Sequence, residues 1–169
     1  MDITKTLKGA IIYDLEGNRM FSKIFDESID DKQYEKKLLT KTRTQRIKDE
    51  KLILDNTLIV HKFVNEIHFY IVGCKGENPL ILDSVLECLV EVVTSLLNKS
   101  VERHSFQKKL AQIVLAFDEI CDNGMIIETD SSRVLQRVCL KDDLAEQTMT
   151  QRLQSATEQF KFSWIRSYS

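Results

Sequence analysis

The chain has 169 residues, which is enough for one domain with a single hydrophobic core. Hydrophobic residues make up 43% and charged residues 30% of it, the balance of an ordinary globular protein rather than of a disordered one. The formal net charge of -2 provides no overall field that would attract nucleic acid or anionic lipid, so we expect no nucleic-acid partner.

The N-terminal region predicts a β-hairpin. Leu7–Tyr13 is a short apolar run, and Asp14–Asn18 follows it with turn chemistry, since Gly17 and Asn18 tolerate a positive φ. Met20–Phe25 then alternates between two faces, as a strand does. We therefore expect two paired strands.

A basic segment follows the hairpin. Asp31–Lys51 contains eight Lys or Arg residues against four Asp or Glu residues, a formal charge of +4. Tyr34, Leu38 and Thr42 recur at helical spacing and form a narrow apolar stripe. The pattern predicts one surface helix over Asp30–Lys51.

The chain then returns to strand chemistry. Leu52–Leu54, Leu58–Phe63 and Ile67–Gly73 are rich in β-branched and aromatic residues and are joined by short connections, which favours antiparallel pairing. The last of these strands is apolar on both alternating faces, so it must be covered on both sides. The predicted fold class is α/β (α+β), with a five-stranded antiparallel sheet flanked by helices on both faces.

A long buried helix is expected next. Asn78 can cap its free amides and Pro79 suits its first position. Its apolar residues follow at helical spacing through Leu80–Leu97. That run is interrupted by Asp83, Ser84, Glu87 and Glu91, so it is not a membrane span.

The C-terminal third predicts further helices. Ser100 is a candidate cap for a second helix, and Asn123-Gly124 is a candidate stop for it, with Gly124 in the left-handed conformation. Ser131–Cys139 predicts a short third helix. We expect a domain over residues 1–141 and a C-terminal amphipathic helix over 142–169, packed on the domain or on a partner.

The tail provides the candidates for a partner interface. Its last apolar residues are Phe160, Phe162, Trp164 and Ile165. Aromatic side chains are enriched at protein interfaces. Two interpretations stay open: this patch folds back onto its own core, or it contacts a partner.

The basic helix provides the candidates for a second contact. The residues chosen for contact with acidic lipid or an acidic partner surface are Lys36, Lys37, Lys41, Arg43 and Arg46. The alternative interpretation is a solvated helix face. The segment lacks the interleaved aromatic residues that stack on nucleic-acid bases.

No residue pattern points to catalysis or to a metal. The four cysteines form no CxxC motif, so a zinc site is not expected. We expect reduced and mostly buried thiols. His61 and His68 fall on neighbouring strands and can lie close together, but no third ligand accompanies them. The acids around Asp118 and Glu119 are better explained as polar contacts at a helix end than as a hydrolytic pair. We expect no catalytic, cofactor-binding or metal site.

The order and spacing of several blocks resemble the coatomer zeta subunits, the small chains of the COPI vesicle coat. The likeness runs from Lys8 to Arg166, and its main blocks are Gly9–Asp26, His68–Leu80 and Asp118–Asp130. The tail pattern in Glu146–Trp164 looks like the coatomer chain rather than the sigma subunits of clathrin adaptors, which are the alternative. The chain departs from the family pattern at Pro79 and in its more basic Asp30–Lys51 segment.

This resemblance implies a longin-type fold and a structural role without enzyme activity or cofactor. It implies pairing with the large gamma subunit of coatomer and, through it, membership of the whole coat. It also implies indirect recruitment by an Arf-type GTPase to the cytosolic face of Golgi membranes. The transport step implied is retrograde Golgi-to-ER and intra-Golgi traffic. We thus expect a cytoplasmic protein that is peripheral on Golgi membranes and COPI vesicles.

Overall fold

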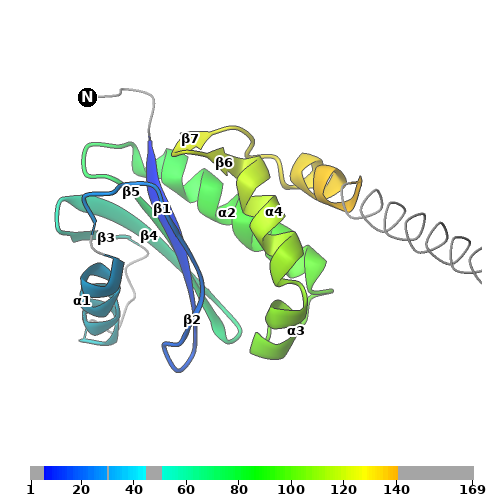
Figure 1. Ribbon diagram of the computed structural model, residues 1–169, viewed down its shortest axis with the longest axis horizontal. Coiled ribbons are helices and arrows are strands. Elements are labelled where there is room, and N and C mark those ends of the chain that lie inside the picture. Colours follow the sequence, from blue (N-terminus) through cyan, green and yellow to red (C-terminus); the bar gives the residue numbers. More distant parts are fainter. Residues whose placement is uncertain (1–5, 30, 45–50, 141–169) are drawn as a thin grey trace, which may run out of the picture.

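A five-stranded antiparallel sheet organises the molecule (Figure 1). The computed structural model describes residues 6–29, 31–44 and 51–140. The order of the strands across the sheet is β2-β1-β5-β4-β3. Their bounds are Leu7–Asp14 for β1, Arg19–Ile24 for β2, Lys51–Leu54 for β3, Thr57–Val64 for β4 and Ile67–Cys74 for β5. The predicted sheet and its antiparallel pairing are confirmed.

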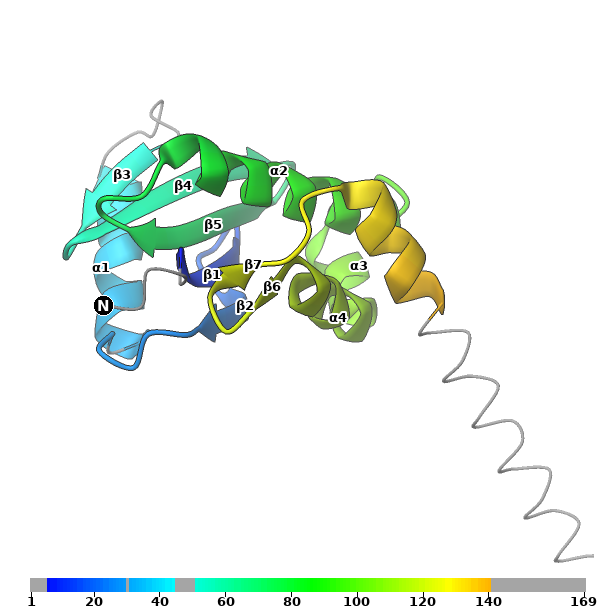
Figure 2. The ribbon, with the colours of Figure 1, turned by 90° about the horizontal axis from the view of Figure 1, so that it is seen from above.

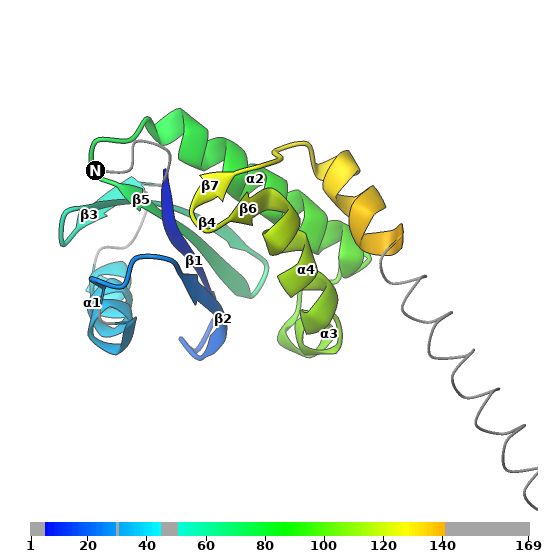
Figure 3. The same cartoon turned by 45° about the horizontal axis from the view of Figure 1, so that its top comes forward.

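Helices cover both faces of this sheet, as expected. The helix α1 packs on one face, while α2 and α4 pack on the other (Figures 1 and 2). Their bounds are Asp31–Thr44 for α1, Pro79–Leu96 for α2, Arg103–Lys108 for α3 and Leu110–Ile120 for α4. Residues 131–140 are also helical and lie beside α2 and α4 (Figure 3). Within the described ranges, none of these helices has the length and apolar character that crossing a bilayer requires.

The alternation of β5 divides the core in two. Ile67, Phe69 and Ile71 are fully buried in the cluster that contains α2 and α4. Tyr70 and Val72, which alternate with them in sequence, are buried in the cluster that contains α1. Successive side chains of a strand point to opposite faces, so one strand supplies both cores.

The start of α2 follows the chemistry of its first residues. The Asn78 side chain accepts a hydrogen bond from the Leu80 amide at 3.0 Å, and Pro79 occupies the first turn. Both features satisfy or remove amides that the helix itself cannot pair. The predicted cap and the predicted central helix are confirmed.

The basic helix is shorter than the predicted Asp30–Lys51. As described, α1 ends at Thr44, and Lys51 already belongs to β3, where it pairs with Val60. The reason lies in the following turn: Asp55 and Asn56 have φ of 42° and 65°, which closes a tight hairpin and aligns β3 with β4. Residues 45–50 lie outside the described part of the chain.

The second predicted helix needs two corrections. It begins at Arg103 after the N-cap Glu102, not after Ser100, and its two parts, α3 and α4, meet at Lys109. It ends at Ile120, before the predicted stop. Asn123-Gly124 instead forms the turn of a small hairpin.

That hairpin joins β6 (Cys121–Asp122) to β7 (Met125–Ile126). Asn123 and Gly124 have φ of 47° and 86° there. An Asn-Gly pair suits such a turn as well as it suits a helix cap. The Leu7 amide donates to the Gly124 carbonyl at 3.0 Å, so pairing with the N-terminal strand favours the hairpin.

Gly9 provides a test of how closely the sheet is packed. A Cβ at Gly9 would lie 2.5 Å from the Lys23 carbonyl oxygen of the neighbouring strand. We expect Gly9→Ala to lower the free energy of unfolding by about 1–3 kcal/mol, since overpacking forces the backbone to shift. Urea unfolding followed by circular dichroism measures this change.

Gly76→Ala is the matched control, because a Cβ there would meet no atom within 4 Å. Its effect should stay within about 0.5 kcal/mol. Equal unfolding midpoints for the two variants would contradict the close approach of β1 and β2.

Candidate functional site

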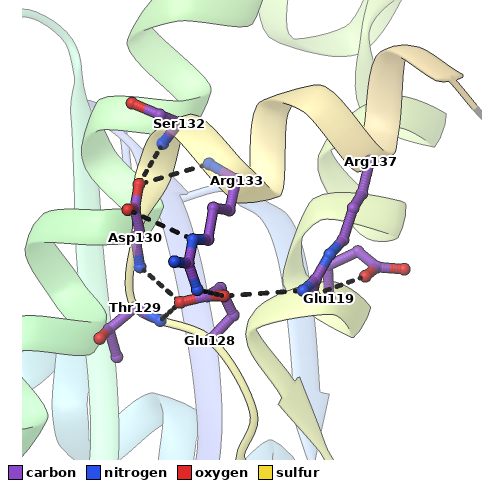
Figure 4. A network of polar contacts seen from close by, with 7 residues as sticks. All are labelled: Glu119, Glu128, Thr129, Asp130, Ser132, Arg133 and Arg137. Carbon is purple, nitrogen blue, oxygen red and sulfur yellow. Dashed lines mark hydrogen bonds and ion pairs between the residues drawn. The ribbon is translucent and has the colours of Figure 1, made fainter.

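The block Asp118–Asp130 anchors the C-terminal helical residues 131–140 (Figure 4). The Glu128 carboxylate accepts the amides of Asp130 and Thr129, each at 3.1 Å, and pairs with Arg133 and Arg137, each at 3.6 Å. The amide of Asp130 is the largest of the contacts that hold the Glu128 pKa below its ordinary value. One carboxylate therefore joins the loop to two turns of the helix.

Asp130 caps the same helix. Its carboxylate accepts the Ser132 amide at 2.9 Å and the Arg133 amide at 3.3 Å, while its carbonyl accepts the Val134 amide at 3.1 Å. Val134 and Val138, one turn apart, are fully buried in the core beside α2 and α4. The cap and the two valines together fix the position of helical residues 131–140 beside α2 and α4.

The neighbouring acids contact different partners. Asp118 forms an ion pair with Lys23 of β2, and Glu119 contacts Arg137 at 3.4 Å. Each carboxylate thus balances a separate cation that ties α4 to another element. The interpretation of this block as polar contacts at a helix end is confirmed.

The two histidines do come together. Nε2 of His61 lies 3.0 Å from Nδ1 of His68, and the His61 ring stacks on Tyr70 with centroids 4.6 Å apart. Burial, and then the charge of His68, lowers the pKa of His61 to about 4. Burial also lowers the pKa of His68, against the opposing effect of Asp14. The lowered pKa values keep both rings neutral near pH 7. No group of three potential metal ligands occurs within the described residues.

The cysteines behave partly as expected. All four lie in the described part of the chain, and no disulfide joins any of them. Cys88 and Cys121 are buried, and burial raises their thiol pKa values to about 12 and about 11. Cys74 is half-buried and Cys139 is exposed, so only two of the four thiols are buried.

The basic helix directs part of its charge inward. Lys37 forms an ion pair with Asp55 in the β3–β4 turn, and the Lys41 ammonium donates to the Ile53 carbonyl oxygen of β3. Lys36 is exposed on the helix surface. Two of the five residues chosen for lipid or acidic-partner contact therefore hold the edge of the sheet, a role that charge counting in the sequence missed.

The remaining candidates are outside what the structure describes. The side chain of Arg43 and the whole of Arg46 fall in its gaps, and so do Phe160, Phe162, Trp164 and Ile165 of the tail. The division between a domain over residues 1–141 and a helix over 142–169 falls at the same limit. These stay predictions.

Comparison with known proteins gives a consistent picture. Residues 6–145 match the family model "Clathrin adaptor complex small chain". The chain is 37% identical over 168 residues to the human protein named coatomer subunit zeta-1, covering 95% of this chain and 94% of that protein. It is 33% identical over 177 residues to coatomer subunit zeta-1 of Arabidopsis thaliana, covering 98% of this chain and all of that one.

A solved structure shows the same fold. A chain in "Homology model of the full-length AP-3 complex in a stretched open conformation" aligns with a TM-score of 0.63 over 86% of this chain and 98% of its own length. The two sequences are 16% identical. This chain therefore shares the fold of the adaptor small chains.

The histidine pair makes stability depend on pH. The pKa of His61 lies below its ordinary value of 6.5, so the unfolded chain takes up a proton first, and stability is lost as pH falls from 6.5 toward 4. We expect about 3 kcal/mol of this loss to come from His61. Unfolding in urea at a series of pH values measures it.

His61→Gln should flatten this part of the pH profile, because glutamine keeps a polar contact and does not titrate. His104→Gln, at an exposed position, is the control and should leave the profile unchanged. A wild-type profile that is level between pH 4 and 6.5 would show that the pair is not held neutral.

The Asp130 cap predicts a local effect. Asp130→Ala should destabilise helical residues 131–140 by about 1 kcal/mol, because two backbone amides lose their acceptor. Hydrogen exchange of amides 133–138 measures this directly. Asp122→Ala, an exposed acid in the same block, is the control, and equal exchange rates in both variants would rule out the capping role.

Proposed function

The chain belongs to the coatomer zeta subunits, within the clathrin adaptor small-chain family, and we propose that it is the structural small subunit of a COPI coat. One observation carries the proposal: identity of 37% extends over nearly the whole of both chains, whereas the AP-3 chain shares the fold at 16%. The identity therefore favours coatomer over a clathrin adaptor.

The proposed role is scaffolding by pairing with the large gamma subunit. The acids of the Asp118–Asp130 block support a role without catalysis, since Asp118 pairs with β2 and the others named above position the C-terminal helical residues. A small domain that pairs permanently with a large chain covers apolar surface of both. Through that pair the protein would join the rest of coatomer.

The proposal includes a cellular setting. The assembled coat, recruited by an Arf-type GTPase that this chain contacts only indirectly, would hold the protein on the cytosolic face of Golgi membranes. Its transport step would be retrograde Golgi-to-ER and intra-Golgi traffic. Membrane association would then be peripheral and mediated by the coat.

The tail is proposed as one contact with the large subunit. Phe160, Phe162, Trp164 and Ile165 share the aromatic and aliphatic character of interface cores. The helical residues 131–140 carry the chain to this segment from a fixed position beside α2 and α4. For the basic helix, Lys36, Arg43 and Arg46 remain the proposed candidates for contact with acidic lipid or protein.

A sigma-type small subunit of a clathrin adaptor complex is the second candidate. The family model and the AP-3 likeness both favour it, because they carry the same fold. The two candidates differ in which large chain they bind, so one binding experiment separates them.

Co-expression with the gamma coatomer trunk tests the proposal. We expect a one-to-one complex that co-elutes in size-exclusion chromatography, and greater solubility of the small chain in the complex than alone, since apolar surface becomes covered. Multi-angle light scattering measures the stoichiometry.

The large chain of a clathrin adaptor serves as the control partner in the same experiment. Binding to that chain and not to gamma would transfer the assignment to the sigma type. Separate elution from both would leave the fold without the proposed pairing.

A further inference from the structure

The strand β3 presents an unpaired backbone edge. It ends the sheet, and among the described residues β4 is the strand that pairs with it. The two-residue turn makes Leu54 and Thr57 the hydrogen-bonded pair that closes the hairpin. Hydrogen-bonded and non-hydrogen-bonded pairs alternate, so the next pair, Ile53 and Leu58, directs its amides and carbonyls away from each other. The Ile53 amide and carbonyl therefore point out of the sheet.

Lys41 of α1 occupies part of this edge. Its ammonium donates to the Ile53 carbonyl oxygen, the group that a further strand would use. Proteins commonly protect sheet edges with lysine, because a charged side chain discourages unspecific pairing. This contact confirms that the Ile53 carbonyl faces away from β4.

An apolar strip flanks the edge on the α2 side. The Lys51–Asp83 ion pair at 2.8 Å and the Lys62–Glu87 pair show that α2 runs in the same direction as β4. Leu80 lies one turn before Asp83, so it is on the β3–β4 turn side of the Lys51–Asp83 ion pair. The side chains of Leu80 and Ile53 are 66% and 52% exposed.

The α1 side of the same edge is basic. Lys37 and Lys41 both reach the β3–β4 hairpin from α1. A strand added beyond β3 would place alternate side chains on the two faces of the sheet. Its residues on one face would meet lysines, and its residues on the other would meet Ile53 and Leu80.

We propose that β3 is a docking edge for an extended segment of the large coat subunit, in which acidic and apolar side chains alternate. The acidic residues would face Lys37 and Lys41, and the apolar residues would cover Ile53 and Leu80. The Lys41 ammonium would leave the Ile53 carbonyl and pair with a carboxylate of the partner. The carbonyl would then be available to an acidic strand only. This inference rests on the proposed pairing with a large coat chain.

A second copy of this chain fits the edge less well. Pairing of β3 with another β3 would bring the Lys41 side chains of both copies together, whereas Lys37 and Lys51 are each paired with an acid of their own chain. Like charges placed opposite each other destabilise strand pairing. The charge of the edge therefore selects an acidic partner over self-association.

The main test uses Ile53→Pro in the purified complex with the gamma coatomer trunk. Proline removes the outward amide, and an edge strand tolerates it at such a position. We expect the Kd, measured by isothermal titration calorimetry, to rise at least about tenfold. In the wild-type complex the Ile53 amide should also become protected from hydrogen exchange.

Charge reversal tests the other face. Lys41→Glu should weaken binding by about tenfold or more, since it would repel an acidic strand. Lys108→Glu is the matched control: the same reversal at an exposed lysine of α3, a helix with no proposed contact, should change the Kd by less than about threefold. Leu15→Ser, at an apolar residue that is 65% exposed in the β1–β2 turn, controls for loss of apolar surface elsewhere.

The outcomes separate the inference from the function on which it rests. If wild-type protein fails to bind the large chain, the proposed pairing is wrong. If wild-type protein and Ile53→Pro bind equally, and unfolding shows both are folded, the docking edge is wrong while the pairing stands. Loss of binding in Lys41→Glu alone would indicate a charged contact without strand addition and would also overturn the inference.

Discussion

The burial of β5 on both faces is the constraint from which the rest of the fold follows. This strand lies between β1 and β4, and its residues from Ile67 to Gly73 pair with both neighbours, with one irregularity in β1 between Leu7 and Gly9. Its side chains are apolar on each face, so a single covering layer would leave half of them in water. The chain meets this requirement by inserting α1 after the first hairpin and α2 directly after β5. The two cores on either side of the sheet result from that arrangement.

The three inner strands pair with a neighbour on each side, so the backbone groups that can accept a further strand lie at the edge strands β2 and β3. At β2, Lys23 pairs with Asp118 of α4, which joins that edge to a helix. At β3, Lys41 of α1 binds the outward carbonyl of Ile53. Lys37 and Lys41 of α1 thus form contacts within the domain, because the fold places α1 beside the β3–β4 hairpin. A lysine-rich helix beside a short edge strand protects the edge and, at the same time, gives it a preference for acid.

The sequence predicts the sheet well because the responsible signals are local. Apolar residues on both alternating faces of β5 identify a strand that is covered on both sides. Asn78-Pro79 marks the start of α2 through chemistry confined to one turn. The sequence alone predicts a helix end at Asn123-Gly124, although that pair suits a helix cap and a hairpin turn equally. The hydrogen bond from the amide of distant Leu7 to Gly124 decides for the hairpin. The reach of Lys37 and Lys41 to β3 is likewise missed, since a charge count does not show where a flexible side chain points. Function came from resemblance and identity, because these residues form no chemical motif.

The positions of the two proposed contacts place a demand on the partner. The β3 edge lies at one end of the molecule, while helical residues 131–140 lie at the other, in all three views (Figures 1, 2 and 3). The cap at Asp130 and the burial of Val134 and Val138 fix the position of these helical residues. A short peptide that binds at one end would leave the other contact unused. A partner that uses both must extend across the domain, which suits a large subunit that cradles a small one. For the proposed large-subunit partner, binding both the β3 edge and a surface near residues 131–140 would raise the effective concentration for the second contact.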